Sequence, residues 1–113
     1  MSLMLKAPEL EPFSFVYTTC PTLGIARLLG RNLVDCRYAA CVNIFDNVVS
    51  IYSDEGVCEA SEVILLIKTT QNCRDKVIDF LEKKHPYKTA AILTWDAEAN
   101  IPFVTWMKNH TKS

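Results

Sequence analysis

The first run of apolar and β-branched residues lies at positions 13–19 (FSFVYTT) and predicts a β-strand. Pro21 ends this run, and Thr19 or Thr22 offers a side-chain oxygen that can cap a helix. Between residues 23 and 37, apolar side chains recur at spacings of three and four, as on one buried face of a helix. They are Leu23, Ala26, Leu29, Leu33 and Cys36. The chain is therefore expected to begin with a strand and a helix.

The segment 38–70 has the pattern of antiparallel strands. Residues 38–45 (YAACVNIF) are almost all apolar, and Asp46-Asn47 suits a two-residue hairpin turn, after which residues 48–53 are expected to run back antiparallel. A second turn signal follows at residues 54–56 (DEG). Residues 57–70 then contain EVILLIKTT, the strongest signal of a buried strand in this chain.

A second helix is predicted after this strand, with Thr70 or Asn72 as its cap. Its inward side is expected to carry Cys73, Val77, Phe80, Leu81 and Lys84. His85-Pro86 ends the helix, because proline disfavours helical backbone angles in the residue before it.

The last part of the chain predicts one more strand and a short helix. Residues 89–95 (TAAILTW) read as the strand, and residues 96–100 as a polar loop. Pro102 suits the first position of a terminal helix over residues 103–110.

These elements give the order βαββαβ with a short C-terminal helix, which is the pattern of a ferredoxin-like α+β domain. Both long helices are expected to cover one face of an antiparallel sheet, and another subunit to cover the other face or the strand edges. We expect this single domain to span residues 13–113. Residues 1–12 are expected to be a cloning leader, Met1-Ser2-Leu3, followed by a loose arm.

Composition narrows the class of protein. The chain has 113 residues, enough for one domain, and a net charge of −1, which argues against a basic nucleic-acid binder. No apolar run approaches the roughly 20 residues of a membrane span, and the N-terminus does not have the pattern of a signal peptide. The number of cysteines, five, is odd, which argues against a secreted disulfide framework and predicts a cytoplasmic protein with reduced thiols. No Cys-x-x-Cys motif occurs, which argues against zinc-finger and thioredoxin sites.

Three segments carry a family resemblance through their order and spacing. The first is AACVNI at residues 39–44. The second runs from Ser50-Ile51-Tyr52 through Gly56 and Glu62-Val63 to IKTT at residues 67–70. The third is His85-Pro86-Tyr87, followed by Thr89, Ile92-Leu93 and Trp106. From about residue 13 to residue 107, the chain resembles the CutA family of divalent-ion tolerance proteins.

The resemblance implies a ferredoxin-like homotrimer assembled through strand edges and the terminal helix. It also implies a role in tolerance of copper and other divalent cations, with metal binding, and we expect such a protein not to be an enzyme. By fold analogy, such trimers look like the P-II regulatory proteins, which bind effectors between subunits. The sequence departs from the family at Ser53, where a tryptophan is usual, and at Ala90 and Ala91, where a Pro-Glu pair is usual. The missing glutamate removes a carboxylate near His85, so metal binding is expected to be weaker or to use other ligands.

Three residues are candidate metal ligands. His85 has an imidazole suited to copper or zinc, or else it only fixes the end of a helix. Cys41 lies in an apolar strand, on the face opposite Ala40, and is either a soft ligand or a buried core thiol. Cys20 lies at a helix N-terminus, where backbone N–H groups are expected to lower the thiol pKa, or else it is an ordinary loop cysteine.

A second group predicts a cleft between subunits. Glu62 and Lys68 are six residues apart on one strand and therefore point to the same face. With Tyr52, Tyr87 and Trp106 they would line a site for a small anionic effector, a metal or a protein partner. The alternatives are a salt bridge between subunits for the charged pair, and packing for Trp106.

No known catalytic signature occurs in the sequence. It lacks a nucleophile elbow, a P-loop, a dinucleotide fingerprint and a His-Glu-x-x-His motif. A thiol-dependent enzyme that pairs Cys20 or Cys41 with His85 is the remaining catalytic alternative. The sequence thus favours a trimeric cation-tolerance protein, with a trimeric signalling or scaffold protein as the second hypothesis.

Overall fold

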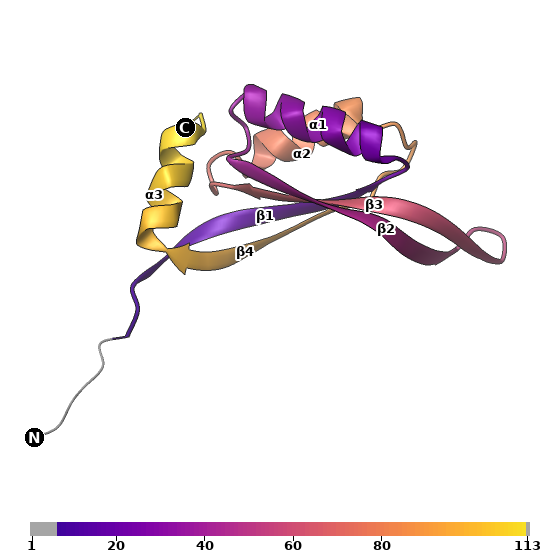
Figure 1. Ribbon diagram of the computed structural model, residues 1–113, viewed down its shortest axis with the longest axis horizontal. Helices are drawn as coiled ribbons and strands as arrows, with labels where there is room; N and C mark the ends of the chain where they lie inside the picture. The colour runs from indigo at the N-terminus through magenta and orange to yellow at the C-terminus, as the bar shows by residue number, and fades with distance from the viewer. Residues whose placement is uncertain (1–6, 113) are drawn as a thin grey trace, which may run out of the picture.

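A computed structural model describes residues 7–112 and contains the predicted order of elements (Figure 1). In chain order they are β1 (Leu10–Cys20), α1 (Leu23–Asp35), β2 (Cys41–Ser53), β3 (Val57–Thr69), α2 (Arg74–Lys84), β4 (Ile92–Asn100) and α3 (Ile101–His110). The βαββαβ order and the terminal helix are confirmed.

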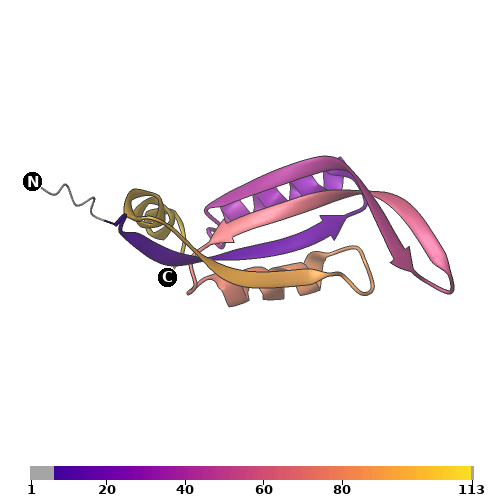
Figure 2. The same cartoon turned by 90° about the horizontal axis from the view of Figure 1, so that it is seen from below.

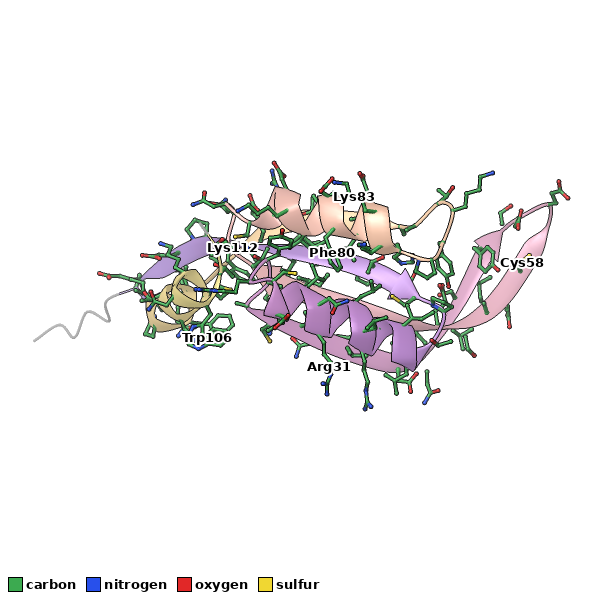
Figure 3. All side chains as sticks on the ribbon, turned by 90° about the horizontal axis from the view of Figure 1, so that it is seen from above. Arg31, Cys58, Phe80, Lys83, Trp106 and Lys112 are labelled. Atoms are coloured by element: carbon green, nitrogen blue, oxygen red, sulfur yellow. The ribbon has the colours of Figure 1, made fainter. Side chains whose placement is uncertain are left out.

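The four strands form one antiparallel sheet in the order β2-β3-β1-β4. Both α1 and α2 lie on the same face of this sheet, and α3 stands at the end where β4 finishes (Figure 1). The hairpin of β2 and β3 extends beyond the helices as an arm, residues 48–62, which carries Cys58 (Figure 3). The α+β prediction, with helices on one face, is therefore confirmed.

The main core lies between the sheet and the two long helices. Every second residue of β1 and β3 points into it, as the alternation of a strand requires. Its buried members are Val16, Cys20, Ala26, Leu29, Leu33, Ala39, Val63, Leu65, Ile67, Val77 and Leu81. Thr22 caps α1 as expected, since its hydroxyl accepts a hydrogen bond of 3.2 Å from the Ile25 amide.

Asp46-Asn47 does not form the predicted hairpin turn. These residues lie inside a single strand, β2, at a register shift between the pairs Phe45–Ile64 and Val48–Glu62, which leaves one extra residue on β2. Asn47 has the left-handed φ of 57° that the turn prediction used. A β-bulge uses the same left-handed conformation, so the local signal was correct but the strand continues through it.

Several other boundaries differ from the sequence expectation. β1 begins at Leu10, and β4 includes residues 96–100, which were expected to be a loop. The α2 helix begins after Cys73 with no side-chain cap, so neither Thr70 nor Asn72 serves as one. The expected leader, Met1-Ser2-Leu3, lies outside the described residues.

Except for α3 at one end, no helix covers the face of the sheet opposite α1 and α2, which Figure 2 shows from below. The side chains on this face are mostly apolar. We call this surface the open face. The registers place on it Phe15, Tyr17, Phe45, Ile64, Leu66, Leu93 and Trp95. Only one end of this face is covered, where Val104 and Met107 of α3 pack against Phe13 and Ala40. Contiguous apolar patches of this kind mark an interaction surface.

The end of α1 adopts a left-handed conformation at a residue that is not glycine. Arg37 has φ of 62°, its amide donates to Val34, and the Tyr38 amide donates to Leu33. These two bonds form a Schellman motif, in which glycine is the usual residue at this position. The Arg37 side chain also donates a hydrogen bond of 3.1 Å to the carbonyl of Asn109.

Two substitutions of Arg37 distinguish the strain of its left-handed backbone from the loss of its hydrogen bond to Asn109. Both Arg37→Ala and Arg37→Gly lose the bond to Asn109, but only glycine relieves the left-handed strain, which is about 1 kcal/mol for an L-residue. We expect the Gly variant to be more stable than the Ala variant by about 1 kcal/mol in urea denaturation. Equal stabilities would contradict strain at this position.

Candidate functional site

Four side chains meet where β1 ends and the connection from α2 to β4 passes. Cys20 is the last residue of β1, and Glu62 lies on β3. His85 is the residue that ends α2, and Tyr87 follows it after Pro86. The extended backbone of His85, with ψ of 136°, places its ring beside β1 and close to the ring of Tyr87, at 4.9 Å between centroids.

Both ring nitrogens of His85 have hydrogen-bond partners. Nδ1 accepts from the backbone amide of Tyr87 at 3.1 Å, so the proton of the neutral ring is on Nε2. Nε2 lies 2.8 Å from the carbonyl oxygen of Thr19 and donates to it. The imidazole therefore joins β1 to the turn after α2, as the structural interpretation of this residue predicts.

Glu62 supplies the carboxylate of this cluster. Burial alone would raise its pKa, but hydroxyl hydrogen bonds from Ser50, Tyr87 and Thr19 lower it below the usual value. The Tyr87 hydroxyl donates to this carboxylate at 2.7 Å. Burial and this bond raise the pKa of Tyr87 to about 12, so Tyr87 remains a hydrogen-bond donor at neutral pH.

Cys20 does not have the lowered pKa expected from its position at a helix start. Its side chain is 0% exposed. Burial, with the charge of Glu62, raises the pKa of this thiol to about 11. The expectation of a reactive thiolate was wrong, because desolvation of the charged form outweighs the helix N-terminus. This environment does not favour the thiol-enzyme hypothesis.

The three candidate metal ligands are only partly brought together. The Sγ atom of Cys20 lies 3.9 Å from Nε2 of His85. Cys41 is half-buried near the start of β2, where it pairs with Lys68. No group of three or more His, Cys, Asp or Glu side chains suited to a metal occurs within residues 7–112. The chain thus provides a two-ligand pair, to which a third ligand would have to be added.

The five residues of the expected cleft lie in two separate places in one chain. Tyr52, Glu62 and Tyr87 belong to the arm and its base. Lys68 lies toward the opposite end of β3, with Nζ 5.7 Å from the ring of Phe103, which stacks on Trp106. Figure 3 shows Trp106 on α3, at the far end of the molecule from Cys58 in the arm. A site containing all five would need residues from more than one copy.

Of the positions that depart from the family, Ser53 lies away from this site, and Ala90 and Ala91 lie in the connection between Tyr87 and β4. Ser53 is the exposed last residue of β2, at the tip of the arm. Ala91 lies just before β4, and its carbonyl accepts a hydrogen bond of 2.8 Å from the Thr18 hydroxyl. Glu62 supplies a carboxylate beside His85 and Tyr87, at a site where a carboxylate was expected to be missing.

The sequence did not single out the hydroxyls of Thr19 and Ser50, which complete the hydrogen bonding of Glu62. Strand pairing brings them together, because Thr19 pairs with Ile64 and Ser50 with Ala60, on either side of Glu62 on β3. For Ser50 the available signal was its place between Val49 and Ile51, whereas Thr19 follows another threonine and gave no such signal.

Comparison with known proteins connects this arrangement to a family. The family model of the CutA1 divalent ion tolerance protein matches residues 14–110, which includes every strand except the start of β1. The chain belongs to the CutA1 family. The resemblance predicted from the three sequence segments is thereby confirmed.

Relatives from distant organisms share both sequence and fold with this CutA1-family chain. Human "Protein CutA" is 35% identical over 102 residues, covering 88% of this chain and 57% of the human protein. The "Divalent-cation tolerance protein CutA" of Thermus thermophilus is 37% identical over 98 residues, covering 85% and 95%. The crystal structure of divalent ion tolerance protein CutA1 from Ehrlichia chaffeensis aligns with a TM-score of 0.86 at 33% identity, covering 89% and 96%.

The relatives differ in length from this chain and are named for different compartments. The chain spans a little over half the length of the mammalian relatives that it matches. Plant relatives are named as chloroplastic, and one archaeal structure is described as periplasmic, so the compartment differs across the family. Within residues 7–112, no helix has the length and apolar character needed to cross a bilayer.

Proposed function

We propose that this protein acts without enzymatic activity as a homotrimer in divalent-cation tolerance, and that it binds copper-type ions weakly through Cys20 and His85. The observation that carries the metal assignment is the 3.9 Å distance between Sγ of Cys20 and Nε2 of His85. Metal–sulfur and metal–nitrogen bonds of about 2.3 and 2.0 Å allow one soft ion to bridge such a pair. Thiolate and imidazole are also ligands that copper and zinc prefer.

Binding at this pair requires two changes in the protein. The imidazole proton has to move from Nε2 to Nδ1, which breaks the hydrogen bonds to Thr19 and from the Tyr87 amide, and the thiol of Cys20 has to lose its proton. Because the thiol pKa is about 11, the protonated form dominates at neutral pH and competes with the metal. Binding is expected to be weak because the site has only two protein ligands and because protons compete with the metal for the thiolate. Glu62, which hydrogen-bonds Tyr87 beside His85, provides negative charge near the bound cation.

Cadmium is a suitable probe, because it is divalent, favours thiolate and does not oxidise cysteine. We expect calorimetric titration of the reduced protein with Cd²⁺ to show binding that strengthens about tenfold per pH unit from pH 6.5 to 8.5. The sign follows from the thiol, whose protonated form does not bind and becomes less abundant as pH rises toward 11. Titration in two buffers of different ionisation enthalpy should show the release of protons as the ion binds.

Variants of the pair and of a distant thiol distinguish this site from others. Cys20→Ser and His85→Gln should each weaken Cd²⁺ binding at least tenfold, and the glutamine can still donate to Thr19. Cys41→Ser is the matched control and should bind as the unmodified protein does. Unchanged binding in both Cys20→Ser and His85→Gln would reject the pair as the site. Stabilisation by a small anion that is lost in Lys68→Ala would then favour an effector cleft between subunits.

Two features support the proposed trimer: the apolar open face and the two uncovered edges of the sheet. Phe45, Leu93 and Trp95 on this face are 50%, 53% and 45% exposed in the single chain. The sheet also ends in β2 on one side and β4 on the other. A closed ring of three is heterologous, so one edge of each copy meets a different edge of the next. Such a ring would cover the open face and bring Lys68 and Trp106 of one copy toward another copy.

A reducing compartment is part of this proposal. All five cysteines are free thiols in the structure, which suits the cytoplasm. The same free thiols are needed if Cys20 is to bind a soft metal ion.

A further inference from the structure

A cavity lies at the end of the sheet where β1 begins. β3 ends at Thr69, which pairs with Ser14, whereas β1 continues beside β4 as far as Leu10. The chain turns away after Thr69, so the residues of β1 before Ser14 pair only with β4 and leave a space on their other side. Its volume is about 560 Å³, within the roughly 300–1,000 Å³ of small-molecule sites. The space is lined by Glu11, Pro12, Thr70, Gln71, Asn72, Lys108 and Thr111.

The cavity is separate from the surfaces that the proposed trimer uses. The outer strands of the sheet are β2 and β4, whereas this space lies between the two inner strands, β3 and β1. α3 closes it from the end of the sheet (Figure 1). Lys108 lies two residues after Trp106, which places it on nearly the opposite side of α3. An assembly through the open face, the outer edges and Trp106 therefore does not need this cavity.

Thr70 brings a buried hydroxyl without a partner to the cavity. The residue is only 8% exposed, and no hydrogen bond joins its Oγ1 to another group within residues 7–112. No side-chain oxygen or nitrogen that is fully shielded from solvent lacks a partner in this part of the chain, so this hydroxyl is open to the cavity that Thr70 lines. By contrast, the hydroxyl of Thr69 donates to the carbonyl of Tyr38 at 2.6 Å. The Thr70 hydroxyl is thus available to a ligand.

The turn that leads into α2 adds further hydrogen-bond donors. The Thr70 carbonyl accepts from the amides of Cys73 and Arg74 at 3.1 Å, so this turn is continuous with the helix. The amides of Gln71 and Asn72 have no acceptor in the described chain, and no side chain caps α2. Free amides at the start of a helix favour a negatively charged group. With the Thr70 hydroxyl, they form a set of donors suited to a carboxylate.

An ion pair lines the cavity from β1 and α3. Nζ of Lys108 lies 3.2 Å from the carboxylate of Glu11, and the two side chains are 61% and 35% exposed. An exposed pair with a single contact contributes little to stability, so it can open to admit a ligand. A simple anion could bind Lys108 but would leave Glu11 unpaired beside a like charge. A ligand with both charges would pair with both residues.

We propose that this cavity binds a small zwitterion with the chemistry of a free amino acid. Its carboxylate accepts hydrogen bonds from the Thr70 hydroxyl and from the backbone amides of Gln71 and Asn72. Lys108 binds the same carboxylate, and the carboxylate of Glu11 binds the ammonium group. The site shares no residue with the proposed metal pair, so the inference does not depend on the proposed function.

The test titrates the isotope-labelled, unmodified protein with L-glutamine, whose side chain can also bind the amide of Asn72. We expect saturable shifts of the backbone amide signals of Gln71 and Asn72 in NMR spectra. Glutaric acid monoamide lacks the ammonium group and 4-aminobutanamide lacks the carboxylate, and each should bind about tenfold more weakly. Binding of inorganic phosphate as tight as that of L-glutamine would overturn the proposal, because the site would then select only an anion. The absence of saturable binding of L-glutamine would overturn it as well.

Variants distinguish recognition from a structural role. Thr70→Val keeps the shape of the side chain and should weaken L-glutamine binding about tenfold, with no loss of stability in urea because the hydroxyl has no protein partner. Glu11→Gln should weaken L-glutamine but strengthen glutaric acid monoamide, which a structural role of Glu11 would not do. Thr89→Val, at an exposed position before β4, is the matched control and should bind normally. Unchanged binding in Thr70→Val, or equal weakening in the control, would reject the site. Cd²⁺ binding should be unaffected by Thr70→Val.

Discussion

A variant with glutamate at Phe45 and Leu93 is expected to be a single folded chain, whereas the unmodified protein is expected to have the mass of three. Both positions are on the open face, Phe45 on the edge strand β2 and Leu93 on the edge strand β4. They are 50% and 53% exposed in the single chain, so a charge there has little effect on the fold. In an assembly the same carboxylates would be buried without partners, which costs several kcal/mol per charge.

Light scattering coupled to gel filtration measures the mass directly. The control, Leu28→Glu/Val34→Glu, replaces two apolar residues of α1 that are 60% and 43% exposed on the helix side. It should keep the mass of the unmodified protein. If Phe45→Glu/Leu93→Glu also keeps that mass, the open face is not the assembly surface. An unmodified protein that has the mass of one chain would reject the trimer itself.

Local patterns in the sequence were sufficient for the order of elements, because periodicity and caps are local properties. The apolar spacing of α1 and its Thr22 cap appear in the structure as predicted. The same argument explains the error at Asp46-Asn47. A left-handed residue serves a hairpin turn and a bulge equally well, and only pairing with β3 decides between them.

The end of β4 was missed for a related reason. Residues 96–100 are polar, and such a segment suggests a loop. In the fold, Asp96 pairs with Ser14 and accepts hydrogen bonds from the hydroxyl of Ser14 at 2.6 Å and the amide of Gln71 at 3.1 Å. These partners are 82 and 25 residues away in the chain. Tertiary contacts therefore make a strand from residues without strong strand preference.

The chemistry of the site was less predictable than its residues. His85 and Cys20 were identified by residue type and by their positions at the ends of helices. Burial of Cys20 is a property of the packed core, and it changes the direction of the expected pKa shift. Likewise, the carboxylate beside His85 is Glu62, which lies 25 residues from Tyr87 in the chain and contacts it through the hydroxyl.

The distance between Glu62 and Lys68 shows the limit of alternation as evidence. Alternation correctly places both on the open side of β3, since six residues is an even number. Six residues of strand also span about 20 Å, so the two charges cannot share one site in one chain. Lys68 instead contacts Phe103. A cleft that contains both charges would therefore have to be formed by more than one copy of the chain.

The largest loss of stability is expected from Leu65→Ala. Leu65 is 0% exposed and lies on β3, between β2 and β1, with its side chain in the core beneath the helices. Removing a fully buried leucine side chain costs about 3 kcal/mol, through lost burial and the cavity that remains. Domains of this size are stable by only about 5–15 kcal/mol, so the variant should be close to unfolding at moderate urea.

Its neighbour Leu66 provides the matched control, because the same truncation on the same strand faces the other way. Leu66 is half-buried on the open face, so Leu66→Ala should cost less than half as much in a single chain. Both changes should be measured by urea denaturation in the Phe45→Glu/Leu93→Glu background, where unfolding is not coupled to dissociation. Equal losses would mean that the two faces of β3 are equally covered in the separated chain, which contradicts the single helical layer. A larger loss for Leu65→Ala would show that a single chain is stabilised mainly by side chains buried beneath α1 and α2. The side chains of the open face would then be buried mainly in the assembly.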